Sequence, residues 1–247
     1  MARILLVGQD KGGVGKSTAV RALAEAVPGA RLIEIDSSHR LLEFDIGEPT
    51  PERRRVSYFP MRADREAIER TGGKAARAEF DEVISAFERT TDPTIVDVGA
   101  NTSSSLFTLL AGLAPDLNAA GLQLGVLVVA TAEPAAIAEA ARLVDLARPW
   151  AAALFVLENQ MRGAVDPRRL NDVAQNGLVS SFSEQAMEAV AVDILQGRGL
   201  RDIPNLEPAQ LNKTYGVALG SRIRRDLTRF RLEAMEAVRA PANWVVG

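Results

Sequence analysis

Residues 3–18 read RILLVGQDKGGVGKST, and this stretch points to the fold of the whole chain. Arg3–Val7 carries apolar residues on both faces, which is typical of a strand buried inside a parallel sheet. A glycine-rich loop follows, and a helical pattern then runs from about Ser17 to Val27. Its apolar residues recur along one face: Val20, Leu23, Ala24 and Val27. A strand, a glycine loop and a helix in direct succession predict the first unit of an α/β sheet.

The rest of the chain repeats this alternation of strands and helices. Further strands are predicted at Arg31–Ile35, Thr94–Val98, Leu124–Ala130 and Leu154–Leu157, with a short one expected in Ile203–Leu206. Helices are predicted near Arg65–Glu69, Ala75–Arg89, Ser104–Leu113, Pro134–Ala147, Ser183–Leu195 and Ala218–Arg239. No repeat or linker interrupts the pattern. We therefore expect one α/β domain over residues 1–247, a mainly parallel β-sheet flanked by helices on both faces.

Composition excludes several classes of site. The chain of 247 residues has no cysteine and one histidine, so disulfides, zinc fingers, iron–sulfur clusters and a Ser-His-Asp triad are not expected. Its formal net charge is −3, which argues against a surface coated with DNA-binding charge. Neither a long apolar run nor a signal-peptide pattern is seen, so a cytoplasmic location is expected.

The glycine loop has the chemistry of a phosphate-binding site. Gly12, Gly13, Val14 and Gly15 let successive backbone N–H groups curl around an anion, and the following helix adds the positive end of its dipole. Lys16 is placed to reach the terminal phosphates, and the Ser17 hydroxyl to hold Mg²⁺, with Thr18 next to it. The common pattern GxxxxGK[ST] fails only at its first glycine, which is Asp10 here.

Three acids stand near the carboxyl ends of predicted strands. Glu34 and Asp36 lie on one face of the second strand, at the edge where α/β proteins bind ligands. Asp97 closes the apolar run Thr94–Val98, as the Asp of a Walker B strand does when it holds the water ligands of magnesium. Burying Asp97 without a cation or a donor would cost several kcal/mol, so a metal-linked role is predicted.

The segment KGGVGKS, residues 11–17, resembles the deviant Walker A loop of the ParA/MinD superfamily of P-loop ATPases. This resemblance implies that Lys11 is the family's signature lysine, which reaches the phosphates of the other subunit in a nucleotide-sandwich dimer. It also implies catalytic roles for Lys16 and for Asp36, which would position the attacking water. Glu34 would then support the water shell of the metal.

The same resemblance implies where the base of the nucleotide binds. Superfamily members carry an Asn after the fifth strand that hydrogen-bonds adenine, and Asn159 stands at that place. Ile203-Pro204-Asn205-Leu206 resembles a later strand beside the base, where Pro204 would contact adenine through backbone groups. ATP rather than GTP follows from the family alone, since the chain has no guanine-reading NKxD motif.

Three further stretches narrow the resemblance: Val96-Asp97-Val98-Gly99-Ala100 followed by serines, Phe155-Val156-Leu157-Glu158-Asn159, and Ile203-Pro204-Asn205-Leu206 leading to Thr214-Tyr215-Gly216 before a long basic helix. In these stretches the chain looks most like the TraL/StbB-type ATPases of conjugative plasmids. The resemblance implies a slow Mg-dependent ATPase that closes a homodimer on ATP and responds to a stimulating partner protein. Its role would be plasmid or chromosome partition, positioning or conjugative DNA transfer, with a nucleoid or plasmid association. Alternatives are a MinD-like membrane-associated ATPase, a metabolic ligase similar to dethiobiotin synthetase, and a nucleotide-binding module without hydrolysis.

The last long predicted helix carries basic residues that could contact a macromolecular partner. Residues 221–231 contain five Arg and one Asp, and Arg222, Arg224, Arg225 and Arg229 are candidates for nonspecific contacts with DNA phosphates. The alternative is that these arginines form a helix face that contacts only solvent. The tail from Ala240 to Gly247 is apolar but short, and Pro241 is expected to break any helix that runs into it, so membrane binding is not expected.

Overall fold

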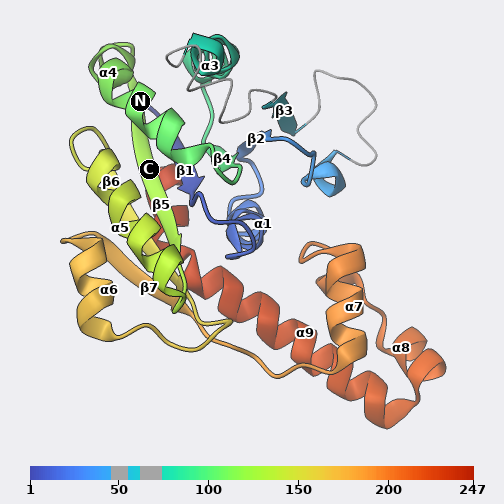
Figure 1. The fold of residues 1–247 in the computed structure, drawn as a ribbon. Coiled ribbons are helices and arrows are strands. Elements are labelled where there is room, and N and C mark those ends of the chain that lie inside the picture. The colour runs from blue at the N-terminus through green and yellow to red at the C-terminus, as the bar shows by residue number, and fades with distance from the viewer. Residues whose placement is uncertain (46–54, 62–73) are drawn as a thin grey trace.

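The computed structural model describes residues 1–45, 55–61 and 74–247, and Figure 1 shows their arrangement. The helix expected near Arg65–Glu69 lies outside the described residues. The strands are β1 (Ala2–Gly8), β2 (Arg31–Asp36), β3 (Val56–Pro60), β4 (Thr94–Val98), β5 (Leu122–Ala130), β6 (Ala153–Asn159) and β7 (Leu178–Phe182). They form one parallel sheet in the order β3-β2-β4-β1-β5-β6-β7. The predicted fold class is confirmed.

Helices cover both faces of this sheet. The α-helices are α1 (Lys16–Ala26), α3 (Lys74–Glu88), α4 (Ser103–Ala119), α5 (Pro134–Ala147), α6 (Pro167–Ala174), α7 (Ala189–Arg198), α8 (Pro208–Tyr215), α9 (Val217–Ala237) and α10 (Arg239–Val246). Short 3₁₀ helices are η1 (Leu42–Phe44) and η3 (Ile203–Asn205). The predicted helix at Pro134–Ala147 matches α5 exactly, whereas α7 begins six residues later than the expected Ser183.

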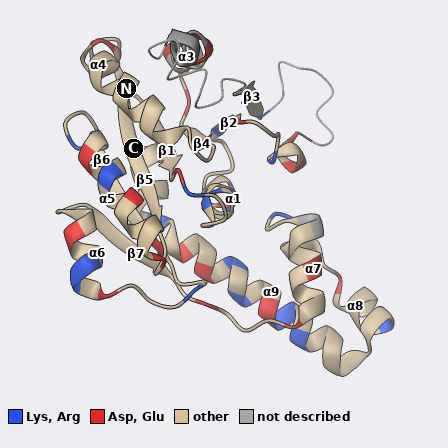
Figure 2. Ribbon diagram, in the orientation of Figure 1, with Lys and Arg blue, Asp and Glu red and all other residues tan. Residues whose placement is uncertain are grey.

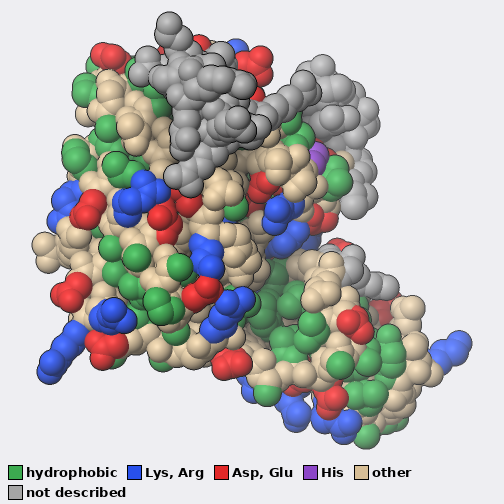
Figure 3. Space-filling model, in the orientation of Figure 1, with side chains coloured by type: hydrophobic (Ala, Val, Ile, Leu, Met, Phe, Trp, Pro, Cys, Tyr) green, Lys and Arg blue, Asp and Glu red, His purple; other side chains and the backbone are tan. Residues whose placement is uncertain are grey.

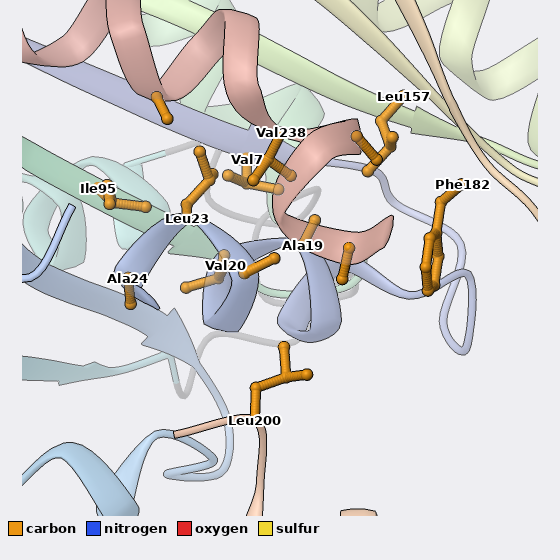
Figure 4. Packing of buried hydrophobic residues seen from close by; sticks show 14 of the residues in the cluster. Val7, Ala19, Val20, Leu23, Ala24, Ile95, Leu157, Phe182, Leu200 and Val238 are labelled. Carbon is orange, nitrogen blue, oxygen red and sulfur yellow. The ribbon is translucent and has the colours of Figure 1, made fainter. Parts of the chain in front are cut away.

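The alternation of strand side chains produces two cores. Leu5 and Val7 of β1 pack with α1, α7, α9 and α10, while Ile4 and Leu6 pack on the opposite face with α3, α4, α5 and α6. All four side chains are fully buried. In Figure 4, Val20 and Leu23 of α1 lie among apolar side chains of the sheet and of the C-terminal helices. This packing holds the start of α1 against the carboxyl end of β1.

One face of the long C-terminal helix α9 packs on the core. Ile223, Leu227 and Ala234 of α9 are buried in the core, and Phe230 is partly buried against it. The first half of α9 extends beyond the sheet and carries α7 and α8, which form a lobe beside the main body (Figure 1). Figure 3 shows hydrophobic side chains gathered on this lobe and where it meets the body.

Two edge strands and one expected strand differ from the sequence prediction. β3 and β7 were not predicted, and both are short strands at the sheet edges, where burial is incomplete and the apolar pattern is weak. The prediction of a strand in Ile203–Leu206 is wrong, because Ile203–Asn205 form the 3₁₀ helix η3 and Leu206 is its C-cap. Pro204 has no backbone N–H to donate to a neighbouring strand, but proline is well tolerated in the first turn of a helix.

The apolar tail forms a helix of its own, α10, and the long helix α9 ends at Ala237, before Pro241, as predicted for a helix that runs into this proline. Pro241 lies in the first turn of α10, where backbone N–H groups have no intrahelical acceptor. The Trp244 ring lies on β5 at Gly125, where a Cβ atom would approach it to 2.5 Å. Arg3 donates to the Trp244 carbonyl at 2.6 Å, and its guanidinium lies 5.4 Å from the ring centroid. The tail therefore packs against the sheet.

Across residues 1–45, 55–61 and 74–247, the helices lack the combination of length and apolar character needed to cross a bilayer.

Candidate nucleotide site

The loop between β1 and α1 has the backbone geometry of an anion cradle. Gly13 and Gly15 have φ angles of +74° and +97°, a region that suits glycine. Gly15 is the N-cap of α1, so the helix begins directly at Lys16 with its N-terminal amides facing the loop. A Cβ on Gly15 would also lie 2.4 Å from the Asn159 amide nitrogen, which leaves no room for a side chain.

A pocket of about 470 Å³ opens over this cradle at the carboxyl ends of the strands. Its lining comprises Gly12, Gly13, Gly15, Lys16, Ser17, Thr18, Asp36, Arg40, Ala100, Asn159, Met161, Phe182 and Phe230. Most of the predicted phosphate-binding residues therefore share one cavity. Val14 is the exception, because its side chain is 2% exposed and packs into the core.

Lys16, Ser17 and Asp97 meet at the start of α1. Burial raises the pKa of the Asp97 carboxyl to about 6, although the Ser17 side chain and the nearby Lys16 charge oppose this rise. Burial also lowers the pKa of Lys16, while Asp97, Asp36 and Asp10 oppose that shift. A hydroxyl beside a buried carboxylate is a donor set that suits hydrated Mg²⁺, so these residues fit the predicted metal. In the described part of the chain, no three acidic or histidine side chains form a direct metal cage.

The two acids of β2 have different surroundings. Asp36 lines the pocket, and its carboxylate accepts hydrogen bonds from the Ser37 hydroxyl at 3.1 Å and the Ser38 amide at 3.3 Å. Glu34 is fully buried, and its oxygens accept from the backbone N–H of Arg40 at 2.6 Å and bond to His39 Nδ1 at 2.5 Å. These contacts are an additional role that the sequence did not predict, and support of the metal's water shell by Glu34 stays a prediction. Glu34 anchors the loop after β2.

Asn159 and Pro204, the two residues expected at the base, are not brought together. The Asn159 amide lines the pocket and donates to the Val14 carbonyl at 2.9 Å, so it ties the end of β6 to the phosphate loop. Pro204 is exposed in η3 and is not part of the pocket lining. Its place beside Asn159 is taken by Phe182 and Phe230, whose rings pack edge to face with centroids 5.1 Å apart. This aromatic pair was missed because its members lie on β7 and α9, far apart in the sequence.

Lys11 points away from the pocket lining. Its ammonium lies 2.5 Å from a carboxylate oxygen of Glu133, which also pairs with Arg162 at 2.7 Å. The hydrogen bond from Lys11, together with the two positive charges, lowers the pKa of Glu133. The chain's own Glu133 therefore holds this lysine in the structure, a contact that the sequence does not indicate.

Gln9 and Asp10 connect the glycine loop to neighbouring elements, and neither contact was predicted from the sequence. The buried Gln9 amide donates to the carbonyls of Val129 and Ala136 at 2.9 and 3.0 Å, and its oxygen accepts from the Lys11 N–H at 3.3 Å. Asp10 accepts from the Ser103 amide at 2.7 Å, so it caps α4 across 93 residues of sequence. The replacement of glycine by Asp10 in the motif was the available signal.

The basic face of α9 is only partly free of acidic partners. Figure 2 shows basic and acidic residues in alternation along this helix. Arg222 pairs with Glu188 at 2.6 Å, and Arg229 donates to the Ala186 carbonyl at 3.1 Å. Within the described residues, Arg224 and Arg225 have no acidic partner and line a shallow groove of about 790 Å³. Of the four candidates for DNA contacts, these two present their charge most freely.

The chain resembles solved structures in overall shape. A MinD cell division protein from Aquifex aeolicus is 18% identical over 92% of this chain and 98% of its own, with a TM-score of 0.45. An ATP complex of a McdA variant from Cyanothece is 13% identical over 92% and 96%, with a TM-score of 0.47. A plasmid partition protein from Borrelia burgdorferi is 13% identical over 92% and 98%, with a TM-score of 0.42. No family model and no curated protein matches the sequence.

Proposed function

We propose that this chain is a Mg-dependent ATPase of the ParA/MinD type, working as a switch whose homodimer closes on ATP and reopens after hydrolysis. The observation that supports it most strongly is the meeting of Lys16, Ser17 and Asp97 at the start of α1, beneath a pocket lined by the loop glycines. Lys16 would bind the terminal phosphates, and Asp36 would orient the attacking water. Bound Mg²⁺, held by Ser17 and through water by Asp97, would neutralise phosphate charge.

The cellular role follows from the resemblance of the KGGVGKS loop, which is found in ATPases that position DNA or other cargo. We propose plasmid or chromosome partition, positioning or conjugative DNA transfer in the cytoplasm, with a partner protein that stimulates hydrolysis. In this proposal Lys11 leaves Glu133 and reaches the second subunit when the dimer forms. The TraL/StbB-type relationship remains part of the proposal.

Asp36→Ala tests the dimer switch. Removing the carboxylate that orients water should slow hydrolysis by about 100-fold or more and trap the ATP-bound state. Light scattering with Mg-ATP should then show a mass twice the 26.5 kDa of one chain, and a single-chain mass without nucleotide.

The control is Asp172→Ala, which removes an exposed acid on α6 and should behave as the unmodified protein. A single-chain mass for Asp36→Ala with ATP demonstrably bound would contradict the switch. That outcome would favour a metabolic ligase of the same fold, and small acids would be tested as substrates.

A nonspecific DNA contact by α9 is a second part of the proposal, supported by Arg224 and Arg225, which have no acidic partner among the residues that the structure describes. Replacing both with Ala should lower the affinity for duplexes of any sequence. The slope of log K against log salt should shrink by about 2, because two phosphate contacts are lost. Fluorescence anisotropy across a salt series measures both quantities.

The matched control for this experiment removes the same charge elsewhere. Arg168 and Arg169 are exposed on α6, and replacing both with Ala should leave the salt slope unchanged if the α9 face carries the contact. Equal losses in the two double variants would instead assign DNA binding to net charge, and absence of binding by the unmodified protein would remove DNA from the proposal.

A further inference from the structure

Arg40 lines the pocket over the loop glycines and takes no part in the proposed binding of phosphate, metal or water. Its side chain is 54% exposed, and its Nε lies 3.5 Å from an Asp36 oxygen and 3.2 Å from the Ser38 hydroxyl. Arg40 lines the same pocket as Lys16, and its charge is one of the influences that lower the pKa of Lys16, after burial. Two cations therefore repel each other across a cavity where a polyanion would attract both.

The backbone that carries Arg40 is fixed on both sides. The buried Glu34 carboxylate accepts from the Arg40 N–H at 2.6 Å, and the Arg40 carbonyl accepts from Arg21 at 2.8 Å. Arg21 is itself paired with Glu43 at 2.5 Å.

The neighbouring residue adds to this support. His39 bonds to Glu34 at 2.5 Å and stacks on Tyr58 with ring centroids 4.6 Å apart. The backbone of residues 39–41 is thus held in place, whereas the Arg40 guanidinium is half exposed and contacts the Asp36 carboxylate and the Ser38 hydroxyl. A fixed backbone with a half-exposed, long side chain is suited to delivering a charge to one place.

We propose that Arg40 is a catalytic residue acting within its own chain, where its guanidinium contacts the terminal phosphate of bound ATP and stabilises the charge that develops during hydrolysis. This inference rests on the proposed ATPase function. Water forms a bond to the γ-phosphorus as the bond from that phosphorus to the β–γ bridging oxygen breaks. ADP and inorganic phosphate leave, and one proton of the water passes through Asp36 to solvent.

The contact between Arg40 and Asp36 links the two roles. While the guanidinium lies beside Asp36, it competes for the carboxylate that would otherwise accept a hydrogen bond from water. Movement of Arg40 to the phosphate would release Asp36 for that task. The same movement therefore supplies a positive charge to the phosphate and frees the group that orients the nucleophile.

Arg40→Ala and Arg40→Lys test the inference, with ADP affinity measured by calorimetry and hydrolysis measured in single turnovers. Arg40→Ala should slow hydrolysis about 1,000-fold, the lower end of the effect of an arginine that stabilises a phosphoryl transition state. Its ADP affinity should stay within about threefold, because ADP lacks the phosphate that Arg40 contacts. Arg40→Lys should recover little, since an ammonium lacks the planar fork of donors.

Rescue by added guanidinium distinguishes a direct contact of Arg40 with the phosphate from a purely structural role of Arg40. Low millimolar guanidine hydrochloride should restore part of the activity of Arg40→Ala and none of the activity of Lys16→Ala. Arg148→Ala, an exposed arginine at the end of α5, should hydrolyse ATP at the rate of the unmodified protein. Circular dichroism melts of each variant check folding, and Arg40→Gln replaces Arg40→Ala if the latter melts early.

The outcomes separate the inference from the function on which it rests. If the unmodified protein neither binds nor hydrolyses ATP, the proposed function fails. If it hydrolyses ATP and folded Arg40→Ala or Arg40→Gln is equally fast, only the role of Arg40 is overturned. A variant that loses ADP affinity while its single-turnover rate is unchanged also overturns that role, because Arg40 would then act in binding alone.

Discussion

Lys16→Ala is expected to abolish nucleotide binding at ordinary concentrations. Lys16 is 8% exposed, and its positive charge is attracted by the carboxylates of Asp97, Asp36 and Asp10. Removing a buried charged donor typically costs about 2–5 kcal/mol, so the dissociation constant for Mg-ATP should rise by a factor of roughly 30 to 4,000. Calorimetric titration with ATP and with ADP measures this loss.

A control and a second variant distinguish lost phosphate contact from a damaged fold. Lys213→Ala removes an exposed lysine on α8 and should leave the dissociation constant unchanged. Lys16→Met keeps the apolar stem of the side chain and should also fail to bind while melting close to the unmodified protein. Binding within about threefold of the unmodified protein by either Lys16 variant would show that the loop glycines do not hold phosphate.

Asp97→Asn should make the protein more stable and less active. The pKa of Asp97 is raised from 3.8 to about 6, mainly by burial, so the folded state binds a proton more readily than the unfolded state. Between these two pKa values, stability must fall as the pH rises, by about 3 kcal/mol in total. Asn carries no charge, so the variant should lack this slope and gain stability above pH 6.

Activity should change in the opposite direction. Loss of the carboxylate that holds the water ligands of the metal should reduce ATP hydrolysis by about 10- to 100-fold. Urea unfolding at pH 4.5 and pH 7.5, compared between the two proteins, measures the stability change, and a phosphate-release assay measures the activity. Equal stability of both proteins at pH 7.5, or full activity of Asp97→Asn, would show that Asp97 is not a buried charge kept for the metal.

The local sequence pattern was sufficient to predict the central strands of the sheet and the glycine loop that precedes α1. Arg3–Val7 and Thr94–Val98 are apolar on both faces, and a strand of this kind has to be covered by helices on each side. The glycines before Lys16 allow positive φ angles where the chain turns into α1. These features depend on neighbouring residues only, which is why they were predictable.

Edges and the tail were not predictable in the same way. β7 has an exposed and weakly apolar sequence, and it becomes a strand because β6 offers a free edge to pair with. The tail forms α10 with Pro241 in its first turn, and Trp244 of this helix packs over Gly125 on β5. In both cases the contact is with a distant part of the fold, which the local sequence does not indicate.

The sequence by itself therefore determined the glycine loop, with its positive φ angles, and its position between β1 and α1. The tertiary structure determined the partners of the polar residues at the candidate site: Glu133 for Lys11, the loop backbone for Glu34, and α4 for Asp10. The physical reason is that charges and hydrogen-bond donors pair with whatever the fold brings within about 3 Å. The contact between Gln9 and Ser103 spans 94 residues, and only the crossing order of the strands brings its two ends together.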